Sequence, residues 1–315
     1  EENLVQYLSV FYSHPQWIVK RWLNRFGREE TEKLLIVDNE ISSLTLRINK
    51  LRVSASAFLT LLDERKIQYQ GSRFVDHFIK VKSLSGISQL DVFQKGYFSI
   101  QDESAAMPVL LLAPRPGERV IDMCAAPGGK TTFIGELMNN EGEILAVDKY
   151  DSRLNLITTS CQRLGITNVT SMVADSSNLS VEPADRILVD APCSGLGTLR
   201  KKPDIKWKRE PEDIPRLAAQ QMTLLDNASK LLRDGGVLVY STCTTEPEEN
   251  GDLVKAFLKN HPEFHLEDAG TIVNKSIVSP EGFVETFPHR HQLDGSFAAR
   301  LVKSPAGPHN SPPQQ

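Results

Sequence analysis

Residues 120–132 (VIDMCAAPGGKTT) constrain the fold more than any other stretch of this chain. An apolar run ends at Asp122, small residues and two glycines follow, and a helix-like pattern then begins. This order predicts a strand, a tight loop and the start of a helix. Because the first amides of a helix have no partner within it, such a loop is suited to bind an anionic or carboxylate group.

Three kinds of cofactor loop compete for this stretch. A nucleoside-triphosphate loop reads G-x-x-x-x-G-K-[ST], but Cys124 stands where its first glycine belongs. A dinucleotide loop reads G-x-G-x-x-G, whereas Gly128 and Gly129 are adjacent and no third glycine follows at the required place. A loop for S-adenosylmethionine fits best, because the next predicted strand ends at Asp148, an acid that can bind ribose hydroxyls. An ordinary glycine turn is the alternative.

Strands and helices alternate over residues 119–260. The pattern predicts strands at 119–122, 144–148, 169–175, 186–190 and 236–241, with helices at 130–138, 152–164, 214–232 and 248–260. Such alternation is typical of a parallel sheet covered by helices on both faces, which binds ligands at the carboxyl ends of its strands. We therefore expect a polar site formed by the strand ends, which are Asp122, Asp148, Asp175, Asp190 and Ser241.

The two ends of the chain follow other patterns. Residues 1–39 predict short helices with Gly27 as a stop signal, and residues 40–95 predict a small α/β unit whose helix is capped by Ser54. Residues 285–289 and 297–302 predict a terminal hairpin, and residues 304–315 a disordered tail. Scattered basic residues of the small unit could contact phosphates, although we favour solvated surface for them: Arg47, Lys50, Arg52, Arg65, Lys66 and Arg73.

Composition indicates a globular chain without a membrane segment. The 315 residues are 40% hydrophobic and 24% charged, enough for one large domain and a smaller one. Neither an apolar run of about 18 residues nor an apolar signal core is present, so we expect a cytoplasmic protein. The four cysteines form no C-x-x-C pair and no histidine lies at metal-ligand spacing, so we expect no metal site.

Two cysteines come directly after predicted strands. Cys193 lies in DAPCSG (190–195), and Cys243 lies in STC (241–243). Amide dipoles and cations at this edge of a sheet lower thiol pKa values and create nucleophiles. Methylation of pyrimidine carbon 5 needs a thiolate that adds to carbon 6, an acid group at the ring edge, and a group that assists elimination. Asp190, Cys193 and Cys243 match these needs, but the residues alone do not rank the two thiols.

Together these segments resemble the RNA cytosine-5 methyltransferases, and within them the bacterial Sun/Fmu type that acts on small-subunit ribosomal RNA. The matching segments are 122–131, 190–195, 202–207, 241–243 and 246–250. The resemblance implies a Rossmann-like α/β methyltransferase domain over 96–303, mostly parallel with an antiparallel terminal hairpin. Residues 1–95 resemble the family's N-terminal extension, a helical part plus an RNA-recognition-like unit. Sun/Fmu proteins usually carry a further NusB-like domain, so we expect either a fragment or a version that recognises RNA without it.

The resemblance also implies roles for single residues. Cys243 would be the nucleophile, Cys193 would assist product release, and Asp190 would lie between cofactor and target base. The implied contacts of S-adenosylmethionine are Cys124, Ala125, Ala126, Pro127, Gly128, Gly129, Lys130, Asp148, Arg153, Asp175 and Asp190. The implied partner is 16S rRNA, bound by a monomer. The alternatives are a non-catalytic RNA-binding or ribosome-assembly protein, and a related methyltransferase that acts on tRNA.

Residues 200–209 form a basic segment that follows Cys193. They carry six lysines and arginines around Trp207. We predict that this segment contacts RNA phosphates beside the site, with a solvated basic loop as the alternative. Since the target base must leave its stack to reach the cysteines, single-stranded or looped RNA is the expected substrate.

Overall fold

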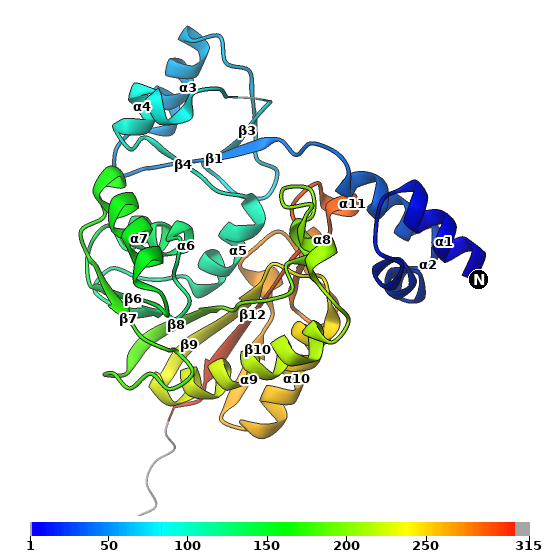
Figure 1. The fold of residues 1–315 in the computed structure, drawn as a ribbon. Coiled ribbons are helices and arrows are strands. Elements are labelled where there is room, and N and C mark those ends of the chain that lie inside the picture. The colour runs from blue at the N-terminus through cyan, green and yellow to red at the C-terminus, as the bar shows by residue number, and fades with distance from the viewer. Residues whose placement is uncertain (1, 83, 306–315) are drawn as a thin grey trace, which may run out of the picture.

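The computed structural model describes residues 2–82 and 84–305, and the chain forms two separate sheets (Figure 1). The large sheet has eight strands and the small one has four. The tail expected to be disordered, 304–315, lies outside the described residues from residue 306 onward.

The large sheet has the order β10-β12-β9-β8-β5-β6-β7, with β11 paired to β12. Its parallel strands are β5 (Arg119–Asp122), β6 (Glu143–Asp148), β7 (Val169–Val173), β8 (Ala184–Asp190) and β9 (Leu232–Thr242). The antiparallel strands are β10 (Phe264–Glu267), β11 (Val284–Thr286) and β12 (Ser296–Lys303). The predicted fold class, including the terminal hairpin, is confirmed, whereas β10 was not expected.

Helices cover both faces of this sheet because alternate side chains of its strands point in opposite directions. Ile121 and Val189 pack in one apolar cluster with α9 and α10, and their neighbours Val120 and Leu188 pack in another with α5 and α6. The helices are α5 (Glu103–Leu112), α6 (Gly129–Leu137), α7 (Asp151–Leu164), α9 (Asp213–Leu231) and α10 (Gly251–Asn260). The last helix begins three residues later than predicted, after a short turn.

The small sheet follows a β-α-β-β-α-β order. Its strands β1 (Leu44–Ile48), β2 (Tyr69–Gly71), β3 (Phe78–Val81) and β4 (Phe98–Ile100) are antiparallel, in the order β2-β3-β1-β4, with α3 (Ala55–Glu64) and α4 (Asp91–Gln94) between them. Ser54 caps α3 as predicted, accepting a hydrogen bond from the Ala57 amide at 3.2 Å. Because β4 pairs with β1, this sheet extends past residue 95, where we expected the unit to end.

Arg47 of β1 joins the small sheet to the large domain. Its guanidinium is buried and donates to the Gly129 carbonyl at 2.7 Å, to Thr132 Oγ1 at 3.0 Å and to Glu136 Oε1 at 2.8 Å. Burial alone lowers the pKa of Arg47, and the Glu136 carboxylate opposes that shift. Arg47 therefore lies on neither a phosphate-binding face nor a solvated surface, and both sequence interpretations of this residue are wrong.

Two helices, α1 (Glu2–Phe11) and α2 (Gln16–Asp38), form the N-terminal segment. Gly27 adopts a non-helical conformation with φ 75° and ψ 177°, so the first helical stretch of α2 stops there as predicted, and a second stretch continues to Asp38. None of the helices in the described ranges is both long and apolar enough to cross a membrane.

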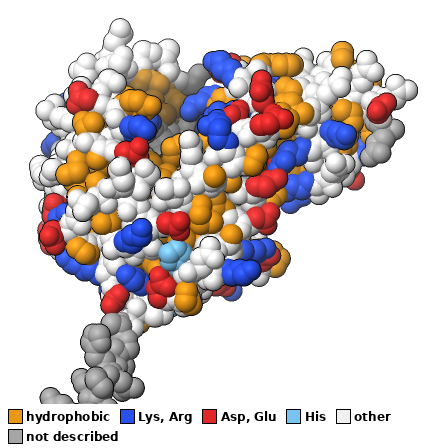
Figure 2. Space-filling model, turned by 60° about the horizontal axis from the view of Figure 1, so that its bottom comes forward, with side chains coloured by type: hydrophobic (Ala, Val, Ile, Leu, Met, Phe, Trp, Pro, Cys, Tyr) orange, Lys and Arg blue, Asp and Glu red, His pale blue; other side chains and the backbone are white. Residues whose placement is uncertain are grey.

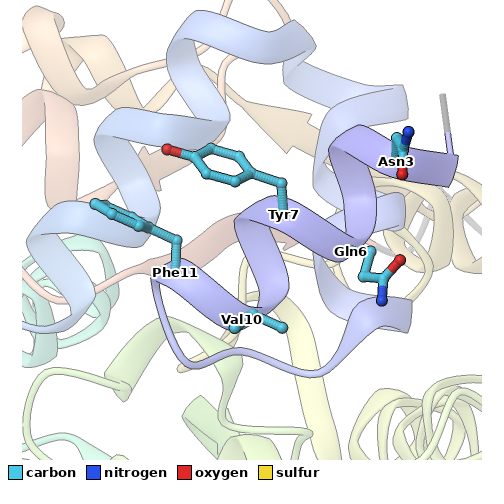
Figure 3. A pocket seen from close by; sticks show the side chains of 5 residues that line it. All are labelled: Asn3, Gln6, Tyr7, Val10 and Phe11. Atoms are coloured by element: carbon cyan, nitrogen blue, oxygen red, sulfur yellow. The ribbon is translucent and has the colours of Figure 1, made fainter.

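The outer face of α1 leaves apolar side chains exposed. Tyr7, Val10 and Phe11 are each more than half exposed, and with Asn3 and Gln6 they line a shallow hollow of about 350 Å³ (Figure 3). This lining has no carboxylate, thiol, histidine or cation. We therefore look for the functional site at the carboxyl ends of the large sheet.

Candidate active site

The carboxyl ends of the parallel strands bring the predicted polar residues to one edge. Asp122, Asp148 and Asp190 end β5, β6 and β8, and Ser241 lies near the end of β9. Asp175 is the exception in position, since β7 ends two residues before it. Because β8 lies beside both β5 and β9, the aspartate of β8 is central to the edge.

Asp190 connects the predicted cofactor loop to β9. Its Oδ2 accepts from Lys130 Nζ at 2.6 Å, and its Oδ1 accepts from Ser241 Oγ at 2.8 Å. Burial lowers the pKa of Lys130, but the adjacent Asp190 carboxylate outweighs burial, so the pKa lies above its ordinary value. Lys130 therefore stays a cation and fixes the carboxylate in place.

The loop after β5 is shaped by Gly128. Its φ is +101°, and a Cβ at this position would lie 3.1 Å from the Cα of Ile157, so only glycine fits without a shift. Gly128 is also the N-cap of α6 and offers no side chain to bond the first amides of the helix. Thr131 Oγ1 donates to Asp122 Oδ2 at 2.7 Å and ties the first helical turn to β5. Within the described part of the chain no side chain caps these amides, so they are available to a ligand.

Asp148 and Arg153 support the other side of the loop. Asp148 Oδ2 accepts from the Ala126 amide at 3.3 Å and lies 3.3 Å from Arg153 Nη1. Arg153 Nη2 donates to the Ala126 carbonyl at 2.8 Å. Only the family resemblance implied a role for Arg153, and the structure places its side chain directly against the loop.

The pKa values of Asp175 and Asp122 are shifted in opposite directions. Hydrogen bonds from the Ser177 hydroxyl and amide, followed by Lys149 Nζ at 3.0 Å, lower the pKa of Asp175 to about 2. Burial raises the pKa of Asp122 to about 7, and its Oδ1 has no hydrogen-bond partner in the described protein. An unpartnered buried oxygen at a sheet edge indicates a place where a ligand group can bind.

The structure brings together the two cysteines that follow strands. The Sγ atoms of Cys193 and Cys243 are 3.2 Å apart, and the Cys243 amide lies 3.3 Å from Cys193 Sγ. Cys243 is exposed and Cys193 is half-buried. The hydrogen bond from Cys193 lowers the pKa of Cys243, with Lys130 and Lys202 acting in the same direction. The same bond, together with burial, raises the pKa of Cys193.

The remaining two cysteines are in different surroundings. Burial raises the pKa of Cys161, inside α7, to about 11. Burial, reinforced by Asp122, raises the pKa of Cys124 well above its ordinary value. Cys243 is thus the one thiol of the four whose pKa is lowered, a ranking that the sequence could not give.

Glu249 is a site residue that the sequence did not single out. Its buried carboxylate accepts from the Ser194 amide at 2.8 Å and from Gln221 Nε2 at 2.9 Å, and Gln221 also donates to the Pro192 carbonyl. The segment on both sides of Cys193 is therefore held by one carboxylate and one amide. The only sequence signal was the place of Glu249 in the matched segment 246–250.

Most lysines and arginines of the basic segment 200–209 contact other residues of this protein. Lys206 is buried, Lys201 pairs with Asp102 and Asp294, and Lys208 pairs with Asp204. Arg209 donates to the carbonyls of Cys193 and Ser194. Lys202 and Trp207 are exposed, and their side chains form no ion pair or hydrogen bond with the described residues, which leaves them as the members best placed to meet RNA.

The edge suits S-adenosylmethionine. The amides at the start of α6 match its carboxylate, and the carboxylates of Asp148, at the end of β6, and of Asp175, two residues after β7, match its hydroxyl and amino groups. Within residues 2–82 and 84–305, no group of three or more His, Cys, Asp or Glu side chains could hold a metal ion.

Comparison with known proteins shows to which family the chain belongs. Residues 109–302 match the family model "16S rRNA methyltransferase RsmB/F", and residues 14–87 match a ferredoxin-like domain of RsmF/B-like methyltransferases. A Bacillus subtilis protein named "Probable ribosomal RNA small subunit methyltransferase B" is 36% identical over 96% of this chain and 69% of its own length. Ribosomal RNA small subunit methyltransferase B of Yersinia pseudotuberculosis is 35% identical over 93% and 67%.

A solved structure agrees with these sequence matches. The crystal structure of NSun6 from Pyrococcus horikoshii with the S-adenosylmethionine analogue SFG has a TM-score of 0.83 and 26% identity, over 92% of this chain and 98% of that one. The chain therefore belongs to the RsmB/F family of 16S rRNA methyltransferases, which use S-adenosylmethionine.

Proposed function

We propose that this protein methylates carbon 5 of a cytosine in 16S rRNA through a covalent bond between Cys243 and the pyrimidine. The observation that carries the proposal is the 3.2 Å separation of the Cys193 and Cys243 sulfurs. Asp190, bound by Lys130 of the cofactor loop, lies at the same edge of the sheet. A methyltransferase that acted on an oxygen or an exocyclic nitrogen would need neither thiol.

The two thiols have different roles in the proposed reaction. Cys243, whose pKa is lowered, attacks carbon 6 as a thiolate, and the new bond makes carbon 5 nucleophilic. Bound S-adenosylmethionine supplies the methyl group. A base then removes the carbon 5 proton, and the bond between Cys243 and carbon 6 breaks. Cys193 keeps its proton because its pKa is raised, so it donates a hydrogen bond to the departing thiolate.

Asp190 is proposed to bind the target base. Lys130 and Ser241 each donate a hydrogen bond to one of its two oxygens and fix their direction. A carboxylate has further acceptor capacity on both oxygens, which suits the amino edge of a cytosine. This geometry supports a choice of cytosine over uracil, which carries a carbonyl at that position.

We further propose roles for the loop and its surroundings. Residues 124–130 hold the amino-acid end of S-adenosylmethionine, Asp148 binds the ribose hydroxyls with Arg153 behind it, and Asp175 binds the adenine. The domain that carries these residues follows β4 and reaches residue 303, because β4 belongs to the small sheet although it lies within the predicted range 96–303. Lys202 and Trp207 contact RNA next to an unstacked target base.

Incubation of the protein with 16S rRNA and isotopically labelled S-adenosylmethionine tests this function. We expect label in 5-methylcytosine, measured by mass spectrometry of the digested nucleosides, and loss of that label in Cys243→Ala. The Cys161→Ala variant is the matched control and keeps activity, because Cys161 lies inside α7. Label in another nucleoside contradicts the proposal. Binding of RNA without any methyl transfer favours the non-catalytic alternative.

A further inference from the structure

The N-terminal helix α2 reaches the loop that follows Cys243. Glu246 of that loop is fully buried, and its Oε1 accepts a hydrogen bond from Trp22 Nε1 at 3.1 Å. Its Oε2 accepts from Arg21, and Arg25 donates to the Thr245 carbonyl. Three side chains within little more than one turn of α2 therefore bind two adjacent residues of the Cys243 loop, more than 200 residues away in sequence.

A short chain of hydrogen bonds continues from Glu246 to the residues that directly follow the two cysteines. The Glu246 amide donates to Thr244 Oγ1 at 3.3 Å, and the hydroxyls of Thr244 and Ser194 lie 2.7 Å apart. Thr244 directly follows Cys243, and Ser194 directly follows Cys193. Both hydroxyl residues are fully buried, so each contact is shielded from water. Glu246 is thus connected through two buried hydroxyls to the backbone next to both cysteines.

The loop that follows Cys193 packs on the same helices. Leu196 and Leu199 belong to one apolar cluster with Leu8 and Trp22. Lys206 of α8 (Ile205–Lys208) is buried with its Nζ 3.5 Å from His14 Nε2 and 3.4 Å from Asn39 Oδ1. The N-terminal segment therefore contacts both cysteine loops, by apolar packing on one and by ion pairing on the other.

We propose that Glu246 is a positioning residue: held by Trp22 and Arg21, it sets the separation of Cys193 and Cys243 and so the rate of the chemical step. The inference rests on the proposed function for the assignment of the two thiols. It gives the N-terminal segment a part in catalysis that differs from RNA binding. Glu246 itself touches neither the cofactor loop nor the thiols, so it acts through Thr244 and Ser194.

Two conservative substitutions test the proposal. Trp22→Phe removes the Nε1 donor and keeps an aromatic ring, and Glu246→Gln keeps an acceptor for Trp22 but removes the charge that binds Arg21. Trp17→Phe is the matched control, because Trp17 lies on the same helix and packs against the same cluster but contributes no side-chain hydrogen bond within the described residues. All three variants are compared with the wild type by melting temperature.

The thiol separation is measured without any methyl transfer. Diamide accepts two electrons and two protons from a pair of thiols and joins their sulfurs, so its rate of forming the Cys193–Cys243 disulfide reports their proximity. We expect Trp22→Phe to slow this step and kcat together by about fivefold, and Glu246→Gln by about tenfold or more, from the lost buried hydrogen bonds. KM for S-adenosylmethionine stays unchanged, and Trp17→Phe matches the wild type in both rates.

The possible results separate this inference from the proposed function. If Trp22→Phe and Glu246→Gln lower the melting temperature but leave both rates as in Trp17→Phe, Glu246 is only structural and the inference fails. If kcat falls while the disulfide rate holds, positioning of the thiols is excluded. If the wild type does not methylate cytosine, the proposed function fails, while the disulfide rates still decide whether Glu246 sets the spacing.

Discussion

At the amino ends of the parallel strands charged side chains pair with one another, whereas at the carboxyl ends they surround two thiols. Three arginines at the amino ends have carboxylate partners: Arg186 with Glu118, Arg233 with Asp185, and Arg300 with Glu267. They line a hollow of about 350 Å³ in which acids balance bases. Basic and acidic side chains are likewise intermixed on the face in Figure 2.

The carboxyl ends contain groups that are not balanced in this way. Among the described residues Asp122 keeps a buried oxygen without a hydrogen-bond partner, and Cys243 is an exposed residue whose thiol has a lowered pKa. An ion pair whose charges cancel is explained by stability, whereas an unpartnered carboxylate or an activated thiol costs stability and indicates function. A hollow lined by charges is therefore not by itself a candidate site. Both ends of the sheet hold ion pairs, and what distinguishes the carboxyl ends is the unpartnered Asp122 oxygen and the lowered pKa of Cys243.

The largest difference in kcat is expected between substitutions at the two ends of strand β8. Asp190→Asn weakens the link to Lys130 at the carboxyl end, and we expect kcat for methyl transfer to fall by at least about a hundredfold. Asp185→Asn at the amino end of the same strand leaves kcat unchanged, because Asp185 pairs with Arg233 and the Arg119 amide. Steady-state methylation of rRNA measures both. Equal losses in the two variants would remove the distinction between the ends.

The second-largest effect is expected at the pair of Cys193 and Cys243. Cys193→Ala removes the hydrogen bond that lowers the pKa of Cys243, so less thiolate is present at neutral pH. A rise of one pKa unit makes alkylation of Cys243 by iodoacetamide about tenfold slower at pH 7. Mass spectrometry of the labelled peptide follows the rate. An unchanged or faster rate would show that Cys193 does not activate Cys243.

Asp122 predicts a pH dependence of stability. Its pKa is raised by burial to about 7 in the folded protein, from 3.8. A raised pKa stabilises the folded state below the unfolded pKa, and this contribution is lost as pH rises through the folded pKa. Between about pH 6 and pH 8, the free energy of unfolding of the wild type should fall by about 1 kcal/mol relative to Asp122→Asn. Parallel curves in urea titrations of the two proteins would refute the shift.

The amino end predicts the smallest effect. Arg233 is half exposed in its pair with Asp185, so Arg233→Ala should change the free energy of unfolding by less than about 1 kcal/mol. Methyl transfer should not change. A loss of activity in this variant would mean that the hollow at the amino ends takes part in function.

The strands and the polar edge were predictable because they depend on local patterns. Buried parallel strands are apolar along their length, and an acid at each strand end interrupts that pattern, as at Asp122 and Asp190. β10 has too short an apolar run to be distinguished from a loop, and only its pairing with β12 makes it a strand.

The contacts between distant segments could not be predicted. Arg47 and Lys206 look like ordinary surface cations until tertiary packing buries them, and Glu249 carries no local sign that it holds the Cys193 loop. Each of these depends on a partner more than 50 residues away, which periodicity and spacing do not record.

Trapping the covalent intermediate is the most direct test. The Cys193→Ala variant is incubated with 16S rRNA and S-adenosylmethionine, denatured and digested, and the peptide joined to RNA is sequenced by mass spectrometry. If Cys243 attacks the pyrimidine and Cys193 assists its release, a stable adduct accumulates on the peptide that contains Cys243. An adduct at another residue, or an active wild type whose Cys193→Ala variant accumulates no adduct, would contradict this division of roles.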